Sequence, residues 1–128
     1  MKLALLIALA TLPVAGCATI DQPSTDGIAR ARIGQTVYVD GPKVTPLAVL
    51  EDSRCPMNAR CVWAGQVRLS VKVHLGKGDQ VREIVTGKPI SVADGILELV
   101  EVTPDRVAGE KPFPKQDYRF GFRFMGGL

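Results

Sequence analysis

The residue types that can do chemistry gather in one stretch of this chain, residues 51–65, which holds two of the three cysteines and the only tryptophan. Cys55 and Cys61 are close enough in the sequence for a disulfide to close a short loop between them. Pro56 favours an extended conformation at Cys55, and Asn58 readily adopts a left-handed turn. Such a disulfide would stabilise the fold by about 2 kcal/mol. We expect it to be structural, because redox pairs usually have the Cys-x-x-Cys spacing.

Four side chains in this stretch form a candidate binding loop: Asp52, Arg54, Met57 and Arg60. In a regular strand Asp52 and Arg54, two residues apart, point to the same face, which places a carboxylate beside a guanidinium. We interpret them as an ion pair that fixes the loop rather than as a catalytic pair. Two arginines on a loop constrained by a disulfide are also the arrangement of a protease inhibitor, because preorganisation raises affinity.

The only histidine, His74, alternates with charged residues in a predicted strand. This pattern favours a surface histidine over a metal ligand or a catalytic base. Met57, Met125 and His74 show no clustered spacing, so we expect no metal and no cofactor. The sequence shows no nucleophile elbow, phosphate-binding loop or nucleotide fingerprint. We therefore expect no enzymatic activity, and a small hydrolase is the remaining enzymatic alternative.

A long alternating strand, residues 66–75, leaves directly from this loop and must position it. With a period of two, one face of the segment is apolar and the other polar. The inward set is Cys61, Trp63, Gly65, Val67, Leu69, Val71, Val73 and Leu75, and the outward set is Arg68, Ser70, Lys72 and His74. We expect Trp63 to be a buried anchor of the core at this end, with Gly65 leaving room beside its indole.

The rest of the chain repeats short alternating segments between glycine and proline turn signals. The predicted strands are residues 33–39, 44–54, 66–75, 81–86, 90–93, 96–103 and 118–124. In the last of these the aromatic residues share one parity and Arg119 and Arg123 the other, which predicts a closing strand inside a sheet. No helical period is found. The predicted fold class is all-β, a small antiparallel β-sandwich or barrel with one short disulfide loop.

Local details of this pattern leave alternatives open. Residues 28–32 either begin a strand or stay loose. Pro46, near the start of a strand, indicates an edge position or a bulge. Leu50 breaks the parity of the same strand, which predicts a bulge before Asp52. Residues 104–116 are rich in proline and form a long loop.

The N-terminus predicts the compartment. Lys2 precedes an apolar run, residues 3–12, which is too short to span a bilayer but fits a signal peptide. Residues 14–17, Val-Ala-Gly-Cys, resemble the bacterial lipobox, which implies that Cys17 is lipidated and N-terminal after cleavage. The alternative is an ordinary secretory signal with Cys17 as a spare thiol. Either way the domain is expected outside the cytoplasm, where disulfides persist.

These signals divide the chain into a lipoprotein signal peptide (1–16), a lipidated tether (17–27) and a single β domain (28–128). Ala18 follows the predicted anchor, and similarity to enterobacterial sorting rules favours the outer membrane, facing the periplasm. The expected partners are the membrane, through the N-terminal lipid, and another envelope protein. The formal net charge of +3 is too small to predict nucleic-acid binding.

The cysteine loop also carries a resemblance. Asp52-Ser53-Arg54-Cys55-Pro56, then Cys61 and Val62-Trp63-Ala64-Gly65, is similar to a motif of small bacterial secreted proteins and lipoproteins of unassigned function. This resemblance implies an extracytoplasmic β domain with a short disulfide loop, and it implies no activity. The sequence therefore predicts a non-enzymatic cell-envelope lipoprotein with a binding or structural role. The alternative is a protease-inhibitor-like module that presents the loop from Arg54 to Arg60.

Overall fold

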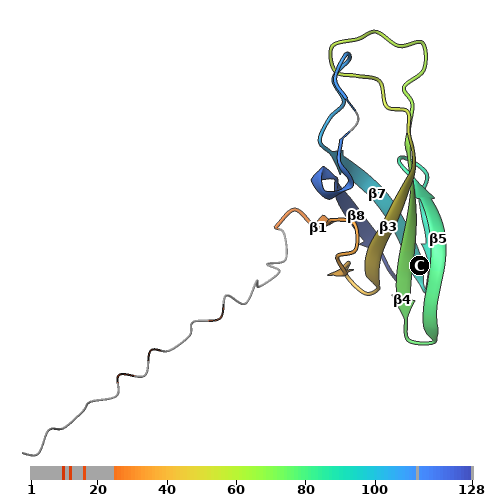
Figure 1. Ribbon diagram of the computed structural model, residues 1–128. Helices are drawn as coiled ribbons and strands as arrows, with labels where there is room; N and C mark the ends of the chain where they lie inside the picture. Colours follow the sequence, from red (N-terminus) through yellow and green to blue (C-terminus); the bar gives the residue numbers. More distant parts are fainter. Residues whose placement is uncertain (1–9, 11, 13–15, 17–24, 112, 128) are drawn as a thin grey trace, which may run out of the picture.

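The computed structural model describes residues 10, 12, 16, 25–111 and 113–127 of the chain (Figure 1). Cys17, the predicted lipidation site, lies outside the described residues, as do most of the predicted signal peptide and tether. Within the described residues, no helix has the length and apolar character needed to cross a membrane.

The described chain forms two antiparallel four-stranded sheets. The strands are β1 (Ala29–Ala31), β2 (Val37–Tyr38), β3 (Lys43–Asp52), β4 (Val67–Leu75), β5 (Gly78–Val85), β6 (Ile90–Val92), β7 (Gly95–Thr103) and β8 (Arg119–Met125). One sheet has the order β1-β8-β7-β6 and the other the order β2-β3-β4-β5. The sheets do not close into a barrel, so the all-β prediction is confirmed in its sandwich form.

The two strands with the cleanest alternation supply the centre of the core. On β4, Val67 and Leu69 are fully buried, while Arg68 between them remains partly exposed on the outer face. On β8, Phe120 and Phe122 are fully buried. Each such side chain contributes about 1.5–3 kcal/mol when it is removed from water. Because β8 lies between β1 and β7, the prediction of a closing strand inside a sheet is also confirmed.

The N-terminal strands differ from the prediction. The strand expected over residues 33–39 shrinks to β2, because Gly34 has a φ of 82° and the chain turns there, with Gln35 N–H donating to the Arg32 carbonyl at 3.1 Å. The segment left open, residues 28–32, forms β1.

The proline and the bulge in β3 are resolved by its pairing. β3 lies between β2 and β4, but its pairing with β2 covers only Lys43 and Val44 and does not extend to Pro46. The register shifts between Pro46 and Ala48, which is the bulge alternative. A second shift between Val49 and Glu51 confirms the bulge predicted before Asp52.

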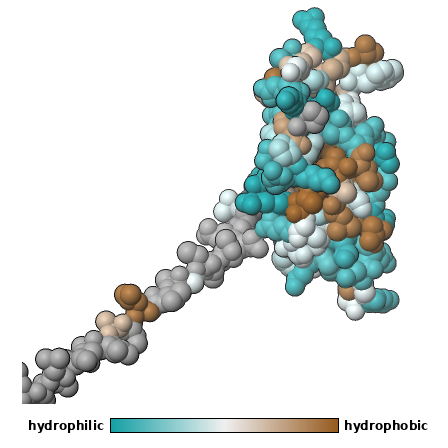
Figure 2. Space-filling view, viewed as in Figure 1, coloured by the Kyte–Doolittle hydropathy of each residue, from teal (hydrophilic) through white to brown (hydrophobic). Residues whose placement is uncertain are grey.

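Two loops stand together at one end of the sandwich (Figure 1). The first, residues 53–66, joins β3 to β4 and is called here the Cys loop. The second, residues 104–118, joins β7 to β8 and ends in a short 3-10 helix, Lys115–Asp117. The turn between β4 and β5 lies at the opposite end. Figure 2 shows hydrophobic surface at the Cys-loop end and a larger hydrophobic area over β3, β4 and β5, whose strands include the exposed Leu50 and Val81.

Candidate functional site

Asp52, the last residue of β3, is the centre of a hydrogen-bonded cluster at the base of the Cys loop. Its Oδ1 accepts from Arg54 Nε at 2.9 Å. Its Oδ2 accepts from Arg54 Nη2 at 2.9 Å and from the Tyr118 hydroxyl at 2.8 Å. The side chains of Asp52 and Arg54 are only 11% and 17% exposed. The predicted ion pair is confirmed, and it is bidentate and nearly buried.

The cluster shifts the ionisation of its members. Burial opposes the charge on Asp52, but the hydrogen bonds from Arg54 and Tyr118 and the positive charge of Arg54 outweigh it, so the pKa of Asp52 is lowered. Burial and the hydrogen bond to Asp52 raise the pKa of Tyr118 to about 12. At neutral pH the carboxylate is therefore ionised and the phenol is protonated.

Arginines tie the base of the Cys loop to the second loop. Arg54 Nη1 donates to the Val102 carbonyl at 2.9 Å, and its Nη2 donates to the Pro104 carbonyl at 3.0 Å. In return, Arg106 Nη1 donates to the carbonyls of Asp52 and Arg54, at 3.3 and 3.0 Å. Each loop thus supplies a guanidinium to the backbone of the other, which fixes their relative position.

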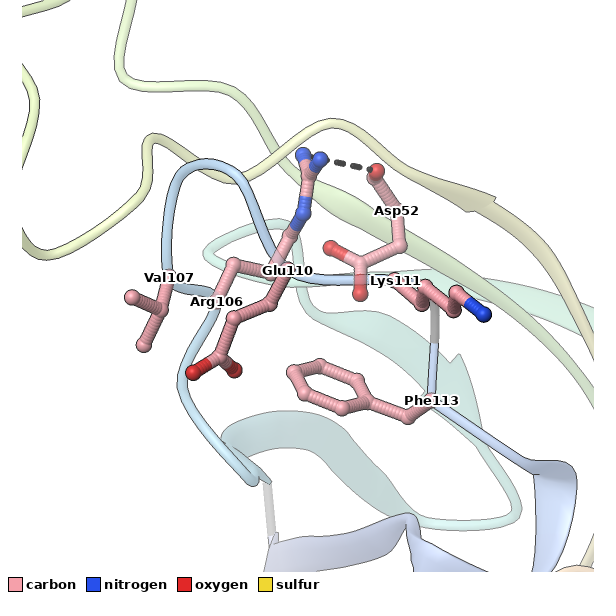
Figure 3. A pocket seen from close by; sticks show the side chains of 6 residues that line it. All are labelled: Asp52, Arg106, Val107, Glu110, Lys111 and Phe113. Atoms are coloured by element: carbon pink, nitrogen blue, oxygen red, sulfur yellow. Dashed lines mark hydrogen bonds between the residues drawn. The ribbon is translucent and has the colours of Figure 1, made fainter.

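A small cavity of about 140 Å³ lies against this cluster (Figure 3). It is lined by Asp52, Arg106, Val107, Glu110, Lys111 and Phe113. In Figure 3 the Asp52 carboxylate and the Phe113 ring face each other across it. Both oxygens of that carboxylate already accept hydrogen bonds from Arg54 or Tyr118. Asp52 is therefore suited to hold the loops together rather than to act as a general base.

The Cys loop continues the pairing of β3 and β4 beyond their ends. Ser53 N–H donates to the Gln66 carbonyl at 2.8 Å, and Gln66 N–H donates to Ser53 Oγ at 3.0 Å. Farther out, Cys55 N–H donates to the Ala64 carbonyl at 3.3 Å. A disulfide joins Cys55 to Cys61, with their Cα atoms 5.9 Å apart, so the predicted bond is confirmed.

Gly65 is needed where the loop returns to the sheet. Its φ is +70°, in the left-handed region that favours glycine. A Cβ at this position would overlap the carbonyl group of Ser53 on the opposite arm of the loop. The expectation that Gly65 leaves room for the indole of Trp63 is wrong, because the neighbour that needs the space is the backbone of Ser53.

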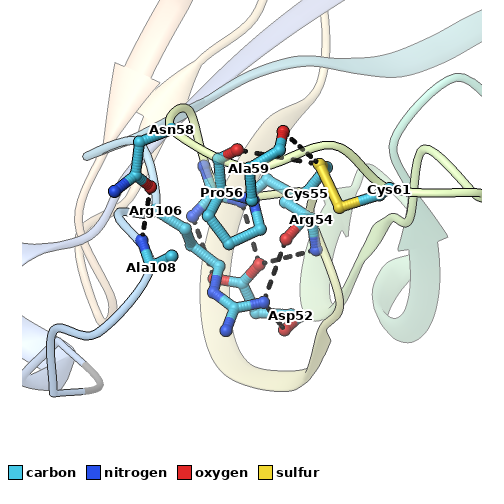
Figure 4. Close-up of a disulfide and its surroundings, with 9 residues drawn as sticks. All are labelled: Asp52, Arg54, Cys55, Pro56, Asn58, Ala59, Cys61, Arg106 and Ala108. Carbon is cyan, nitrogen blue, oxygen red and sulfur yellow. Dashed lines mark hydrogen bonds and ion pairs between the residues drawn. A yellow bond between two sulfur atoms is a disulfide. The ribbon is translucent and has the colours of Figure 1, made fainter.

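One arm of the Cys loop rests on the second loop. Met57 N–H donates to the Arg106 carbonyl at 2.8 Å. Asn58 Oδ1 accepts from Ala108 N–H at 2.7 Å (Figure 4). Together with the disulfide and the Asp52–Arg54 pair, these bonds hold the first half of the loop against the domain.

The tip of the Cys loop, defined here as residues 57–63, projects into solvent. Met57 is 72% exposed, Val62 is 90% exposed and Trp63 is 82% exposed. Cys61 is also exposed. The prediction that Trp63 is a buried core anchor is therefore wrong, as is the inward placement of Cys61. The regular strand begins only at Val67, so the alternation of β4 does not extend into the loop.

His74 lies on the outer face of its sheet, as predicted, but it has partners that the sequence did not reveal. Its Nδ1 is 2.9 Å from Asp79 Oδ1, and its Nε2 is 2.8 Å from Thr45 Oγ1. The order hydroxyl, imidazole, carboxylate matches a catalytic relay. However, Thr45 is only 8% exposed, and its hydroxyl is also 2.6 Å from that of Thr36. We therefore assign this chain of bonds to holding neighbouring strands together.

The predicted binding residues separate into two groups. Asp52 and Arg54 belong to the braced base, whereas Met57 and Arg60 belong to the exposed tip. Sequence reasoning missed the roles of Tyr118 and Arg106 at the base of the loop. It also missed the exposure of Val62 and Trp63 at the tip. The alternation of the closing strand indicated an inward ring for Tyr118 but not the partner of its hydroxyl. Arg106 lies in a loop without periodicity, so the sequence held no signal for it.

Comparison of the chain with protein-family models, with curated proteins and with solved structures found no match. No group of three or more histidine, cysteine, aspartate or glutamate side chains is arranged to hold a metal ion within the part of the chain that the structure describes. The site is therefore interpreted from its geometry alone, as a disulfide-closed loop whose base is held by hydrogen bonds and whose apolar tip is exposed.

Proposed function

We propose that this protein is a non-enzymatic lipoprotein of the cell envelope that binds another envelope component through the tip of the Cys loop. The observation that carries this proposal is the exposure of Val62 and Trp63, at 90% and 82%, on a loop closed by a disulfide. Large apolar side chains exposed side by side on a projecting loop are typical of a binding site. The disulfide restricts the loop that carries them, which lowers the entropy cost of binding.

The membrane anchor is part of the same proposal. The lipobox-like residues 14–17 support lipidation at Cys17, and Ala18 supports an outer-membrane location. Metabolic labelling with a fatty-acid analogue should label the wild-type protein but not the Cys17→Ser variant. Equal labelling of the two would show that Cys17 carries no lipid.

The chemistry of the described residues supports a binding role over catalysis. Asp52, whose pKa is lowered by its partners, has both carboxylate oxygens occupied by hydrogen bonds. Cys55 and Cys61 are joined, so neither is available as a thiolate. The hydroxyl of Thr45, which faces His74, is buried and shared with Thr36.

A second candidate is a protease inhibitor that presents the Cys loop to an active-site cleft. The ion pair of Arg54 with Asp52 counts against the original form of this idea, because Arg54 is not free to enter a cleft. Arg60 and Met57 remain exposed on the constrained loop, which supports a version centred on Arg60. Inhibition of an arginine-specific protease by the wild type, and its loss in Arg60→Gln, would establish this alternative.

The proposed function is tested by a photo-crosslinking amino acid placed at Val62 in growing cells. The control places it at Lys77, an exposed residue in the turn between β4 and β5, at the opposite end of the sandwich from the Cys loop. We expect a specific crosslinked product from position 62 and none from position 77. If position 62 gives no product above the control, the Cys loop is not a binding surface and the proposal fails.

A further inference from the structure

We propose, resting on the function proposed above, that the component bound by the tip of the Cys loop is a bilayer surface containing anionic lipid. Met57, Val62 and Trp63 enter the region between the headgroups and the acyl chains, and Arg60 stays at the level of the phosphates. The tip then supplies a contact with the membrane that does not depend on the N-terminal lipid.

The apolar residues of the tip have the character that this region favours. The amphipathic indole of tryptophan is enriched at membrane–water interfaces. Trp63 is adjacent to Val62, and both are more than four-fifths exposed, at 82% and 90%. Met57, at 72%, adds a flexible apolar side chain from the other arm of the loop. Shallow insertion would remove all three from water.

The charge of the loop favours an anionic partner surface. Residues 53–66 contain two arginines and no aspartate or glutamate. Arg54 is neutralised by Asp52, whereas Arg60 has no ion-pair partner among the described residues. The tip therefore carries one uncompensated positive charge, which an anionic headgroup attracts.

The loop beside the tip is close to neutral. Its three acidic residues, Asp105, Glu110 and Asp117, are matched in number by Arg106, Lys111 and Lys115. Asp105 also lies near enough to act on the charge of Arg54. Among the described residues, the hydrogen bonds between this loop and the tip are made by Met57 and Asn58, on the first arm. The arm that carries Arg60 and Trp63 is the one that meets the membrane in this proposal.

The backbone of the tip sets the depth of insertion. Among the described residues, those from 60 to 63 make no backbone–backbone hydrogen bond. Unpaired N–H and C=O groups are costly in hydrocarbon, so the tip cannot cross into the acyl core. At the headgroup level water still reaches these groups. The disulfide restricts the backbone of residues 55–61, which lowers the entropy cost of inserting the tip.

Trp63 allows a direct test, because it is the only tryptophan in the chain. The full-length protein is reconstituted with vesicles of phosphatidylethanolamine and phosphatidylglycerol, with and without bromine on the acyl chains. We expect brominated lipid to quench the Trp63 emission and aqueous iodide to quench it much less than in the protein without vesicles. Because quenching reports the depth of the indole, lipidation at Cys17 does not by itself produce this result.

Two matched variants and a change of lipid sharpen the test. Val62→Ser should lower the ratio of inserted to free loop by about tenfold, whereas Val81→Ser on β5 should leave it unchanged. Arg60→Gln should lower it by about fivefold, and phosphatidylcholine vesicles should have a similar effect.

The inference is overturned if brominated lipid leaves the Trp63 emission unchanged, or if Val81→Ser reduces quenching and Val62→Ser does not. The proposed function survives this failure if the crosslinker at Val62 still captures a protein in cells. Failure of both experiments would remove the binding function of the loop altogether.

Discussion

The two connections at the ends of β4 solve the same topological problem in different ways. Both join neighbouring antiparallel strands. At one end Gly76 and Lys77 suffice, which is the shortest common hairpin connection. At the other end the chain uses the whole Cys loop, residues 53–66, with a disulfide and an ion pair to hold it.

The difference in length between the two connections separates the residues that the fold requires from those that it does not. A sandwich needs only a short turn between β3 and β4, so the length of the Cys loop is not explained by the topology. The short turn is polar, whereas the Cys loop exposes Met57, Val62 and Trp63. The bonds at the base of the loop are consistent with a projection whose conformation must be kept.

The largest loss of stability is expected when the ion pair at the base of the Cys loop is removed. Arg54→Met leaves the nearly buried Asp52 carboxylate without its cation and should cost about 3–5 kcal/mol of unfolding free energy. Arg68→Met is the matched control, because the Arg68–Glu83 pair is exposed and should cost at most about 1 kcal/mol. Denaturant unfolding compares the two. Equal losses would mean that the base is no more than a surface ion pair.

The same cluster predicts a dependence of stability on pH. Because the pKa of Asp52 is lowered in the folded state, its contribution is present above its unfolded pKa of about 3.9 and is lost as the pH falls through the folded value. Because the pKa of Tyr118 is raised to about 12, its contribution is present below about pH 10 and is lost between these values. Asp52→Asn should flatten the acid limb of the unfolding free energy measured against pH.

Gly65→Ala tests the close approach of the two arms of the loop. The left-handed backbone costs alanine about 1–2 kcal/mol, and the overlap with the Ser53 carbonyl group adds about 1–3 kcal/mol. Gly87→Ala has nearly the same φ, +75°, but nothing lies within 4 Å of its Cβ, so only the first cost applies. If the two variants unfold alike, the approach to Ser53 is not a constraint.

Replacing both cysteines with serine should lower the unfolding free energy by about 2 kcal/mol, because the disulfide closes a short loop. Cys61 is exposed, so a mild reductant should also open the bond in the folded protein. Thiol labelling before and after reduction measures this directly. A bond that resists reduction until the domain unfolds would show that the sulfurs are shielded.

The smallest effect on stability is expected at the tip. Trp63→Ala should change the unfolding free energy by at most about 0.5 kcal/mol, because the indole is 82% exposed. The fully buried Phe120 provides the contrast, since Phe120→Ala should cost about 3–5 kcal/mol. A large loss in Trp63→Ala would place the indole in the core after all. In stability the tip should thus behave like the short turn, and only in binding should the two differ.

The sequence predicted the regular part of the molecule well, because a strand buried on one face must alternate. This is why β4 and β8 were found with their inward faces, and why the bulge before Asp52 was visible as a break in parity. The same rule failed for Trp63, because parity has no meaning once the chain leaves the sheet. Nothing local marks the point where the alternation stops except Gly65.

Contacts between residues far apart in the sequence could not be predicted either. The Asp52–Arg54 pair was predictable because the two residues are neighbours on one strand end. The bonds from Tyr118 to Asp52 and from His74 to Thr45 depend on which strands meet and in what register. The two bulges in β3 set its register with β4. The alternation of residues along a strand does not predict which residues on the facing strand are paired after a bulge.

The strand order also sets a sequence of events during synthesis. Strands β2, β3, β4 and β5 are consecutive in the chain and form one sheet, so that sheet can pair as soon as residue 85 has emerged. The other sheet cannot, because β1 at its edge pairs with β8, the last strand to be made. Until then the second sheet lacks its two strands β1 and β8, and the inner face of the first sheet is only partly covered and open to chaperones and to aggregation. The Cys loop belongs to the sheet that forms first, so its cysteines are brought together before the core is complete.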